Sequence, residues 1–336
     1  MSKNPTIKDI AREANVSIAT VSRYLNSSGH IDESTAKNIA EIIKRLDYRP
    51  NRLARGLKTN YSRNIILVVP DIQNPFYSKM STEIQNLLLN RGYIMTLFNT
   101  DGKYEMEQKS INIASDIGAD GILFAAAEEH KSIIDELKKT NIPTVTINAY
   151  EKDIFDTVYA DREKSTYIAT KYLISKGHKK IGFVGGIINN LGSNRKSGYL
   201  KALNEAGIPF DEELVFEMRL DSNTGIKSGY YFSSMNSMPS AICCGNDAIA
   251  LGLLKSLHYQ GISVPDNVSV TGVDNIIYSE LCFPGLTTIT NDSAEYAKYA
   301  VSALFDRMNG TYSGEPRRYE VNQELVLRDS TCQFNK

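Results

Sequence analysis

The chain is poor in the residues and runs that several classes of protein require. Its 336 residues include only four cysteines and four histidines. Four cysteines are too few for a disulfide scaffold, and neither residue type shows the spacing of a zinc site. No apolar run approaches the roughly 20 residues of a membrane-spanning helix, and the N-terminal MSKNPTIKDI lacks the apolar core of a signal peptide. These absences predict a cytoplasmic protein that binds no metal and crosses no membrane.

Motifs of nucleotide-dependent and hydrolytic enzymes are also missing. The glycine-containing segment KIGFVGG is not a GxGxxG dinucleotide fingerprint, and neither a GxxxxGK[ST] loop nor a GxSxG elbow occurs. No pairing of a nucleophile with a base is visible. Cys243 and Cys244 belong to an apolar run, AICC, which favours two buried strand residues over a redox pair. We therefore expect neither enzymatic activity nor a cofactor.

Charge is divided unevenly along the chain. The whole sequence has a net charge of −1, but residues 1–60 contain 11 basic and 6 acidic residues, which gives this head +5 and leaves −6 for the rest. A basic head on an acidic body indicates that only the head meets a polyanion such as nucleic acid. A basic face that only contacts solvent would have the same composition, so DNA binding has to be argued from a sequence motif as well.

The segment TIKDIAREANVSIATVSRYL supplies that motif. Thr6 and Ser17 are suitable N-caps for two successive helices. Ala11 is small enough for the helices to cross closely, and Asn15 tolerates the left-handed conformation of a tight turn. Val21 fills the gap between the two helices. This spacing predicts a helix-turn-helix, followed by a third helix that begins near Asp32 or Ser34.

The second helix is expected to present its outer face to DNA. Arg23 is suited to a bidentate contact with guanine in the major groove, and Ile18 and Ala19 to apolar contacts with thymine methyl groups. Short hydroxyl side chains beside them suit phosphate contacts. The charge, the outward arginine and the turn spacing together favour DNA binding over a three-helix module with a purely structural role. The residues predicted to contact DNA from the head are Thr6, Ser17, Ile18, Ala19, Thr20, Ser22 and Arg23.

The segment PNRLARGLKT follows the head and predicts a short hinge helix. Its apolar residues form one narrow face, and a helix of two turns is marginal in water by itself. We expect it to form only when it pairs with its symmetry mate on DNA, where Leu57 is a candidate wedge between base steps of the minor groove. Asn51 and Arg55 join Leu57 in the predicted DNA-contacting set. The helix-turn-helix domain is thus placed at 1–49, and the hinge helix and linker at 50–60.

From Asn64 onward the pattern changes to alternating strands and helices. The run IILVVPD has no polar alternation, as expected of a strand buried on both faces of a parallel sheet. This rhythm predicts a doubly wound α/β fold. Further strands are predicted at 93–98, 121–126, 144–148, 180–186, 240–244 and 268–273, with intervening helices that end at Gly92, Gly177, Gly207 and Gly261.

About 275 residues exceed one comfortable core, so two α/β lobes with a crevice at the carboxyl ends of their strands are expected. We place the effector-binding and dimerisation domain at 61–336. Its N-lobe is predicted at about 61–160 and 291–323, and its C-lobe at about 161–290 and 324–336.

Polar and aromatic residues follow four of the predicted strands, where such a crevice binds its ligand. Sugars need bidentate polar groups for vicinal hydroxyls and aromatic faces for their apolar side. Each candidate also has a structural explanation: packing for the aromatic residues, helix or turn capping for Asn246, Asp247 and Asp274, and a solvated basic face for Arg195 beside Lys196. The candidates are Asp71, Phe76, Tyr77, Arg195, Asn246 and Asp274.

Residues 1–60 resemble the DNA-binding head of the lactose-repressor family, with TVSR and YRPNRLARGL close to the motifs of its catabolite-control and purine-repressor members. The segments VVPDIQNPFYSKM, GHKKIGFVGG, NRKSGYLKAL, CGNDAIALGLL, PDNVSVTGVDN and PGLTTI follow in the family's order. The resemblance covers the chain to about Ser330. It implies a repressor that acts as a homodimer on a palindromic double-stranded operator, with a body like periplasmic sugar-binding proteins.

The same resemblance assigns functions to individual residues. In this family the hinge leucine, here Leu57, intercalates at the operator centre, and Arg23 also matches the family residue for residue. The family's positions for a small-molecule effector, such as a sugar or sugar phosphate, fall on Phe76, Tyr77, Arg195, Asn246 and Asp274, with Asp161 as a weaker match.

Two departures narrow what the resemblance implies. Ile276 and Ile277 stand where catabolite-control proteins carry an arginine, which argues against a phosphocarrier protein as corepressor. The C-terminal VLRDSTCQFNK contains no leucine heptad, which favours a dimer over a tetramer. A periplasmic sugar-binding protein would share the body, but it has no use for the basic head. The effector's identity, and whether it releases or tightens DNA binding, stay open.

Overall fold

Contacts divide the chain into two units, Met1–Ser62 and Arg63–Lys336. The structure, a computed structural model, describes residues 5–25, 29–48, 61–125, 131–148, 154–186 and 195–334. Asn51, Arg55 and Leu57, which carry the hinge prediction, lie outside the described residues. Within the described part of the chain, no helix combines the length and apolar character needed to cross a membrane.

The described residues of the first unit include three helices, and the turn between the first two forms as the sequence predicts. The carboxylate of Asp9 accepts hydrogen bonds from the backbone N–H (2.9 Å) and hydroxyl (2.7 Å) of Thr6 at the start of the first helix. Ser17 caps the second helix by accepting a hydrogen bond from the N–H of Thr20 at 3.1 Å. Asn15 has a φ of +53°, which confirms the left-handed turn residue. The helices are α1 (Ile7–Glu13), α2 (Ile18–Leu25) and α3 (Glu33–Arg45).

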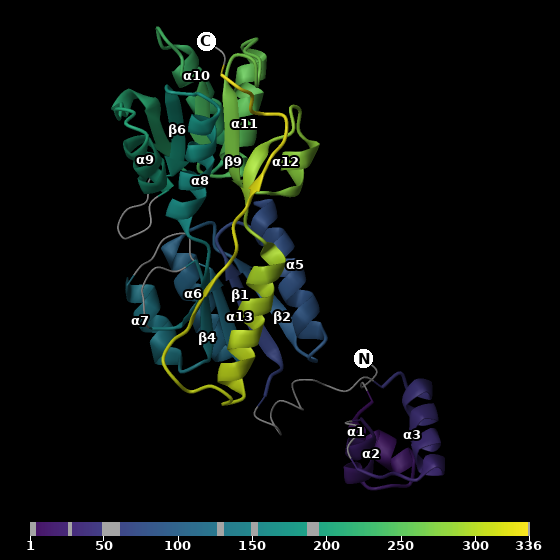
Figure 1. The fold of residues 1–336 in the computed structure, drawn as a ribbon. Helices are drawn as coiled ribbons and strands as arrows, with labels where there is room; N and C mark the ends of the chain where they lie inside the picture. Colours follow the sequence, from purple (N-terminus) through teal and green to yellow (C-terminus); the bar gives the residue numbers. More distant parts are fainter. Residues whose placement is uncertain are drawn as a thin grey trace. The chain divides into compact units, whose positions relative to one another are not determined.

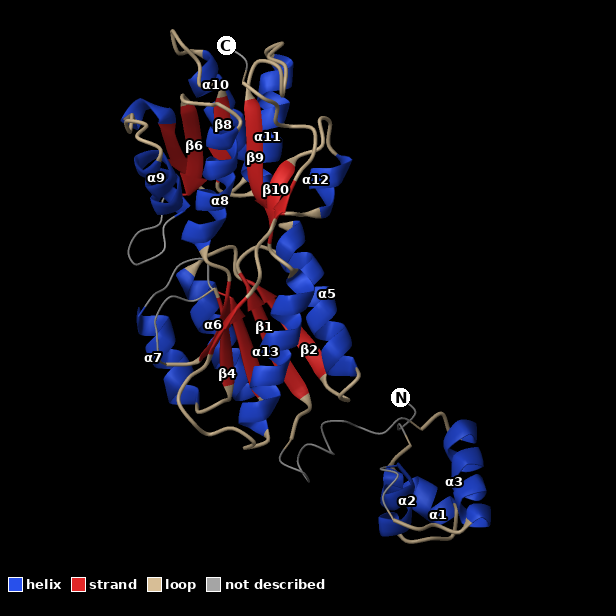
Figure 2. Ribbon diagram, viewed as in Figure 1, coloured by secondary structure: helices blue, strands red, loops and turns tan. Residues whose placement is uncertain are grey.

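The N-lobe of the second unit contains a six-stranded parallel sheet in the order β11-β5-β4-β3-β1-β2. Its strand β1, next to the edge strand β2, is buried on both faces, which confirms the prediction from IILVVPD. Ile65 and Leu67 pack in one core cluster with residues of α5 and α13, while Ile66 and Val68 pack in another with residues of α6 and α7 (Figure 2). The strands are β1 (Asn64–Val69), β2 (Ile94–Asn99), β3 (Gly121–Ala125), β4 (Thr144–Ile147), β5 (Asp156–Tyr159) and β11 (Arg318–Glu320), and the helices are α5 (Pro75–Leu89), α6 (Tyr104–Asp116), α7 (Lys131–Thr140) and α13 (Ser293–Met308).

The C-lobe contains a second six-stranded sheet, in the order β12-β10-β9-β8-β6-β7. All its pairings are parallel except that of β12 with β10. Cys243 and Cys244 are fully buried in β8, as predicted for strand residues. The strands are β6 (Ile181–Gly186), β7 (Val215–Met218), β8 (Ala241–Cys244), β9 (Ser269–Asp274), β10 (Thr287–Thr290) and β12 (Leu325–Val326), and the helices are α8 (Arg162–Ser175), α9 (Arg195–Glu205), η1 (Glu212–Leu214), α10 (Ser222–Ser233), α11 (Asp247–Tyr259) and α12 (Ile277–Leu281).

The chain passes between the two lobes at residues 159–162, 290–293 and 320–325. Figure 1 shows the last of these passages in yellow, running from the end of the N-lobe back to the C-lobe. Each lobe is therefore assembled from segments that are distant in sequence, and the passages lie at the end of the N-lobe that faces the C-lobe.

A buried carboxylate holds the returning segment on the N-lobe. The side chain of Asp156, on β5, is fully buried and accepts hydrogen bonds from Arg307 Nη2 on α13 and from Arg317 Nη2 before β11, both at 2.7 Å. Arg317 also donates to Asp306 at 2.8 Å. Burial alone would raise the pKa of Asp156, but the hydrogen bonds from the two arginines outweigh it and lower the pKa.

Replacing Asp156 should therefore destabilise the second unit strongly. Asp156→Ala leaves two guanidinium groups without their shared carboxylate, and we expect a loss of about 3–5 kcal/mol in urea unfolding at pH 7.5. Because the folded-state pKa is lowered, this stabilisation is present above the unfolded value of 3.8 and is lost as the pH falls through the folded-state pKa. The difference between variant and wild type should begin to shrink only below about pH 4. Asp116→Ala, at an exposed position of α6, is the control. A loss below about 1 kcal/mol for Asp156→Ala would contradict this account of the ion network.

Candidate functional site

The first unit exposes most of the residues predicted to contact DNA. Ser17, Ala19 and Arg23 are exposed, and Ile18 has 46% of its surface accessible although it is apolar. Thr20 and Ser22 are half-buried on the same helix, and Thr6 is exposed at the start of α1. Val21, on the opposite face of α2, is fully buried among α1 and α3 residues. The helix thus has one face for packing and one that is open to a partner.

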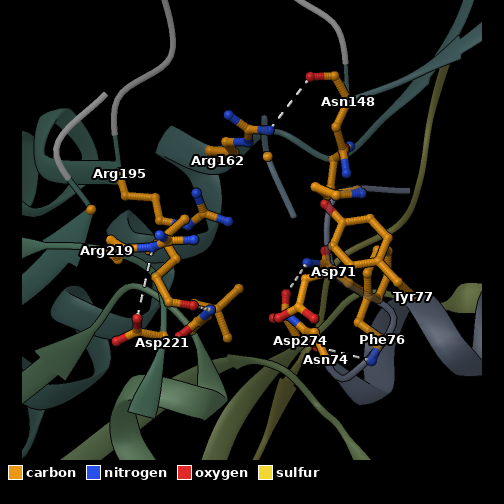
Figure 3. Close-up of a pocket in the computed structure, with 18 of the residues that line it drawn as sticks. Asp71, Asn74, Phe76, Tyr77, Asn148, Arg162, Arg195, Arg219, Asp221 and Asp274 are labelled. Carbon is orange, nitrogen blue, oxygen red and sulfur yellow. Dashed lines mark hydrogen bonds and ion pairs between the residues drawn. The ribbon is translucent and has the colours of Figure 1, made fainter. Parts of the chain in front are cut away.

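A cavity of about 680 Å³ lies in the second unit, among residues that follow strands of both lobes. From the N-lobe, Asp71 follows β1 and Asn148 follows β4. From the C-lobe, Asn246 follows β8 and Asp274 ends β9. Figure 3 shows how the side chains from the two lobes face this space.

Six of the seven predicted effector residues line the cavity: Asp71, Phe76, Tyr77, Arg195, Asn246 and Asp274. Asp161, the weaker match, is not among the lining residues. Its carboxylate accepts hydrogen bonds from the N–H groups of Glu163 (2.9 Å) and Lys164 (3.0 Å) and so caps α8. The next residue, Arg162, lines the cavity instead.

Aromatic residues of the N-lobe form one wall. Phe76 is buried and packs edge to face with Tyr77 and Tyr296, at ring-centre distances of 5.1 and 5.3 Å. Asn74 starts α5 by accepting a hydrogen bond from the N–H of Phe76 at 3.0 Å. The hydroxyl of Tyr296 donates to Asn148 Oδ1 at 2.7 Å. Phe76 therefore has both roles, because its ring packs in the core and also borders the cavity.

Asp274 has an unusual backbone for a residue that is not glycine. Its φ is +116°, a sparsely populated region whose strain is typical of functional positions. Burial raises the pKa of its carboxyl to about 6, while Arg195, a hydrogen bond from Asn291 Nδ2 (2.7 Å) and Arg162 oppose the rise.

A second buried carboxylate, Asp247, supports this part of the site. It is fully buried and accepts hydrogen bonds from the N–H of Ile276 (3.0 Å) and the hydroxyls of Ser279 (2.5 Å) and Thr288 (2.6 Å). Burial and then the charge of Asp274 raise its pKa to about 7. A Cβ at Gly272 would lie 2.0 Å from Asp247 Oδ1, so glycine is required there for the carboxylate to fit. Asp247 thus joins β10 and the start of α12 directly beside Asp274.

Asn246 combines capping with lining. Its Oδ1 accepts a hydrogen bond from the N–H of Ile249 at 2.9 Å, which begins α11, and its Nδ2 donates to the carbonyl of Leu220 at 3.1 Å. Asp247, the other residue considered for this cap, is the first residue of the helix. The side chain of Asn246 is held from both ends and still borders the cavity.

Sequence reasoning missed several lining residues, and most share one cause. Arg162 follows β5, Arg219 follows β7 and Asn291 follows β10, and none of these strands was predicted. Asn148 ends a predicted strand, so its position was a usable signal. Tyr296 belongs to α13, which reaches the cavity only because the chain returns to the N-lobe.

Comparison with known proteins agrees with the two-unit organisation. Residues 6–51 match the bacterial regulatory proteins of the lacI family, and residues 170–331 match the periplasmic binding protein-like domain. The HTH-type transcriptional regulator RegA of Clostridium saccharobutylicum is 34% identical over 333 residues, which cover 97% of this chain and 99% of RegA. The HTH-type transcriptional repressor PurR of Vibrio atlanticus is 34% identical over 335 residues, covering 98% and 99%.

Solved structures show the same architecture. The transcriptional regulator CelR in complex with cellobiose has a TM-score of 0.73 at 25% identity, covering 97% of this chain and 99% of CelR. A LacI family transcriptional regulator from Enterococcus faecium with bound ribose has a TM-score of 0.72 at 26% identity, covering 81% and 100%. The lac repressor dimer bound to operator shares the fold, with a TM-score of 0.88 at 21% identity and coverage of 98% and 100%.

These matches confirm the resemblance seen in the sequence and the predicted fold class of a helical head with a two-lobed α/β body. The curated relatives are a regulator and repressors of transcription, and this chain matches them over essentially their whole length. The chain belongs to the LacI family of bacterial transcriptional regulators.

Proposed function

We propose that this protein is a repressor whose homodimer binds a palindromic operator, and whose DNA affinity changes when a small polar molecule occupies the cavity. The observation that carries the proposal is the cavity itself, because its polar lining comes from both lobes while a separate helical unit exposes a recognition face. An occupant that contacts both lobes favours one lobe arrangement over others. A roughly 100-fold difference in affinity between two arrangements, near 2.7 kcal/mol, makes a useful switch.

The DNA-contacting residues are proposed to be those exposed on α2, with Arg23 reading a base and the hydroxyl residues contacting phosphate. Residues 50–60 are proposed as the hinge, with Asn51, Arg55 and Leu57 in the minor groove. A regulator of this kind acts where the chromosome lies, in the cytoplasm, and needs no catalytic chemistry.

The effector is proposed to be a sugar or a sugar derivative. CelR was solved with cellobiose and the Enterococcus faecium regulator with ribose. In this chain, Phe76 and Tyr77 offer an aromatic wall, and Arg195 and Asp274 offer polar groups. This combination suits the two kinds of surface that a sugar presents.

Exposed apolar side chains around α12 support a dimer. Ile277 and Tyr278 are more than half exposed, Leu281 is 70% exposed and Phe283 is 98% exposed. A cluster of this kind on a soluble protein marks an interaction surface. The lac repressor was solved as a dimer on its operator, and a palindrome requires a two-fold symmetric reader. We propose that a second copy of this chain covers α12.

Arg23→Ala should abolish discrimination between operator and random DNA. Loss of a bidentate guanine contact costs roughly 1–3 kcal/mol in each half-site. The operator is first selected from random DNA with the wild-type protein, and affinities for it and for random DNA are then compared. Lys37→Ala removes the same charge from α3 at an exposed position and should keep the preference. Undiminished preference in Arg23→Ala would refute the assigned contact.

Arg195→Ala should remove the effector's influence on DNA while preserving binding to the unliganded operator, because Arg195 lines the cavity and not the head. The operator complex is titrated with whichever sugar or sugar derivative stabilises the wild-type protein in a thermal-shift screen. Lys201→Ala, on an exposed face of the same helix α9, is the control. If Arg195→Ala responds at the wild-type ligand concentration and to the same extent, Arg195 takes no part in the site.

Leu281→Glu should convert the dimer to a monomer, because it buries a charge in the proposed apolar contact. Sedimentation velocity measures the change, and operator affinity should fall with it. Phe210→Glu, at an exposed apolar position outside α12, should stay dimeric. A Leu281→Glu protein that sediments like the wild type would place the dimer contact elsewhere.

A further inference from the structure

Two arginines reach the cavity from the first residues of neighbouring helices. Arg162 begins α8 and Arg195 begins α9, and Figure 3 shows both side chains extending toward the same space. Burial raises the pKa of Asp274 and of Tyr77, and both arginines oppose that rise at each residue. The positive charges of the two guanidinium groups therefore act on the same part of the cavity.

Arg195 has capacity for hydrogen bonds that the protein does not use. Its Nε and Nη1 atoms are buried and have no hydrogen-bond partner among the described residues. A guanidinium group withdrawn from water without acceptors is costly, so an acceptor supplied by a ligand gains more here than at an exposed site. Arg162 donates a hydrogen bond to the carbonyl of Asn148 at 3.4 Å.

The carboxylates that line the cavity interact with other groups of the protein. At its rim, Asp101 pairs with Lys103 at 2.9 Å and Asp221 with Arg219 at 3.9 Å. Asp71 is exposed, and its carboxylate accepts the N–H of Gln73 in its own loop at 2.9 Å.

Deeper in the cavity, the carboxylate of Asp274 accepts a hydrogen bond from Asn291 Nδ2 at 2.7 Å. The side of the cavity formed by Arg162 and Arg195 is consequently its positive end.

We propose that the effector is a sugar acid, a polyhydroxylated molecule whose carboxylate is held between Arg162 and Arg195. The inference rests on the proposed function and narrows its ligand class. A planar carboxylate matches the fork of a guanidinium group, and two such groups can bind its two oxygens. The hydroxyls would meet Asn148 and Asp274, and the ring would lie toward Tyr77.

One negative charge suits this cavity better than two. Asp71 and Asp274 lie on the wall opposite the arginines in Figure 3, and a phosphate dianion would meet more repulsion from them than a carboxylate does. The same guanidinium pair would still attract a phosphate, so a sugar phosphate belongs in the test as a separate arm.

The test compares matched pairs on the full-length wild-type protein. Thermal unfolding is measured with D-glucuronate against D-glucose, D-galacturonate against D-galactose, and D-gluconate against sorbitol, with sodium chloride equalising ionic strength. Glucose 6-phosphate forms the phosphate arm. We expect at least one acid to raise the melting temperature more than its neutral partner and more than glucose 6-phosphate. If no acid exceeds its neutral partner, the proposal is overturned; if only glucose 6-phosphate does, the carboxylate assignment is overturned.

Variants then locate the contact. Arg162→Gln should weaken binding of the stabilising acid at least tenfold in calorimetry, because it removes the positive charge and leaves a shorter, neutral polar side chain. Arg91→Gln, at an exposed position just after the C-terminal end of α5, should leave the affinity unchanged. Wild-type affinity in Arg162→Gln would overturn the two-arginine site.

Operator binding separates this inference from the proposed function. A neutral sugar that binds and shifts operator affinity, with no acid doing so, would overturn the acid assignment and leave the regulator intact. An acid that binds between the arginines without changing operator affinity would support the assignment and count against the proposed switch.

Discussion

Burial of parallel strands on both faces is the constraint on which the rest of this structure depends. A strand such as β1 alternates its side chains between two helical layers, and both sets are apolar. Apolar side chains therefore fill such a strand, and many of the polar side chains that line the cavity lie where strands end. Because the strands within each sheet run parallel, with the short β12 as the antiparallel exception, their carboxyl ends share one edge. The cavity and its charged lining lie at those edges.

The interior beside Asp274 shows how such a fold accommodates polar groups when it must. Asp247 is completely buried, yet three donors from β10, α12 and the residue before α12 satisfy it. Gly272 leaves the space that its carboxylate occupies. This arrangement positions the residues on either side of Asp274, whose backbone is itself strained. Hydrogen bonds within the protein therefore hold the part of the cavity around Asp274 in place before a ligand binds.

The apolar character of each strand also decided whether the sequence predicted it. Strands such as β1 and β8 are almost continuous apolar runs, and the sequence predicted them. The four-residue strands β5, β7 and β10 contain polar residues that weaken the apolar pattern, and they were missed. Arg162 and Arg219 were missed with them, because a residue can be placed at a strand's end only when the strand is recognised. Asp161 illustrates the limit of motif matching. Asp161 caps a helix, and the next residue, Arg162, lines the cavity.

The three passages between the lobes have a consequence for synthesis on the ribosome. The N-lobe sheet begins at β1 but acquires β11 and the covering helix α13 only after residue 293. The C-lobe sheet is likewise incomplete until β12 has been synthesised. Neither lobe can finish as an independent N-terminal domain while the chain emerges, so most of the second unit must be exposed before either core closes. The helices α1, α2 and α3 of the head follow one another in the sequence and have no such delay. A nascent chain would thus carry a completed DNA-reading module well before it could carry a completed sensor.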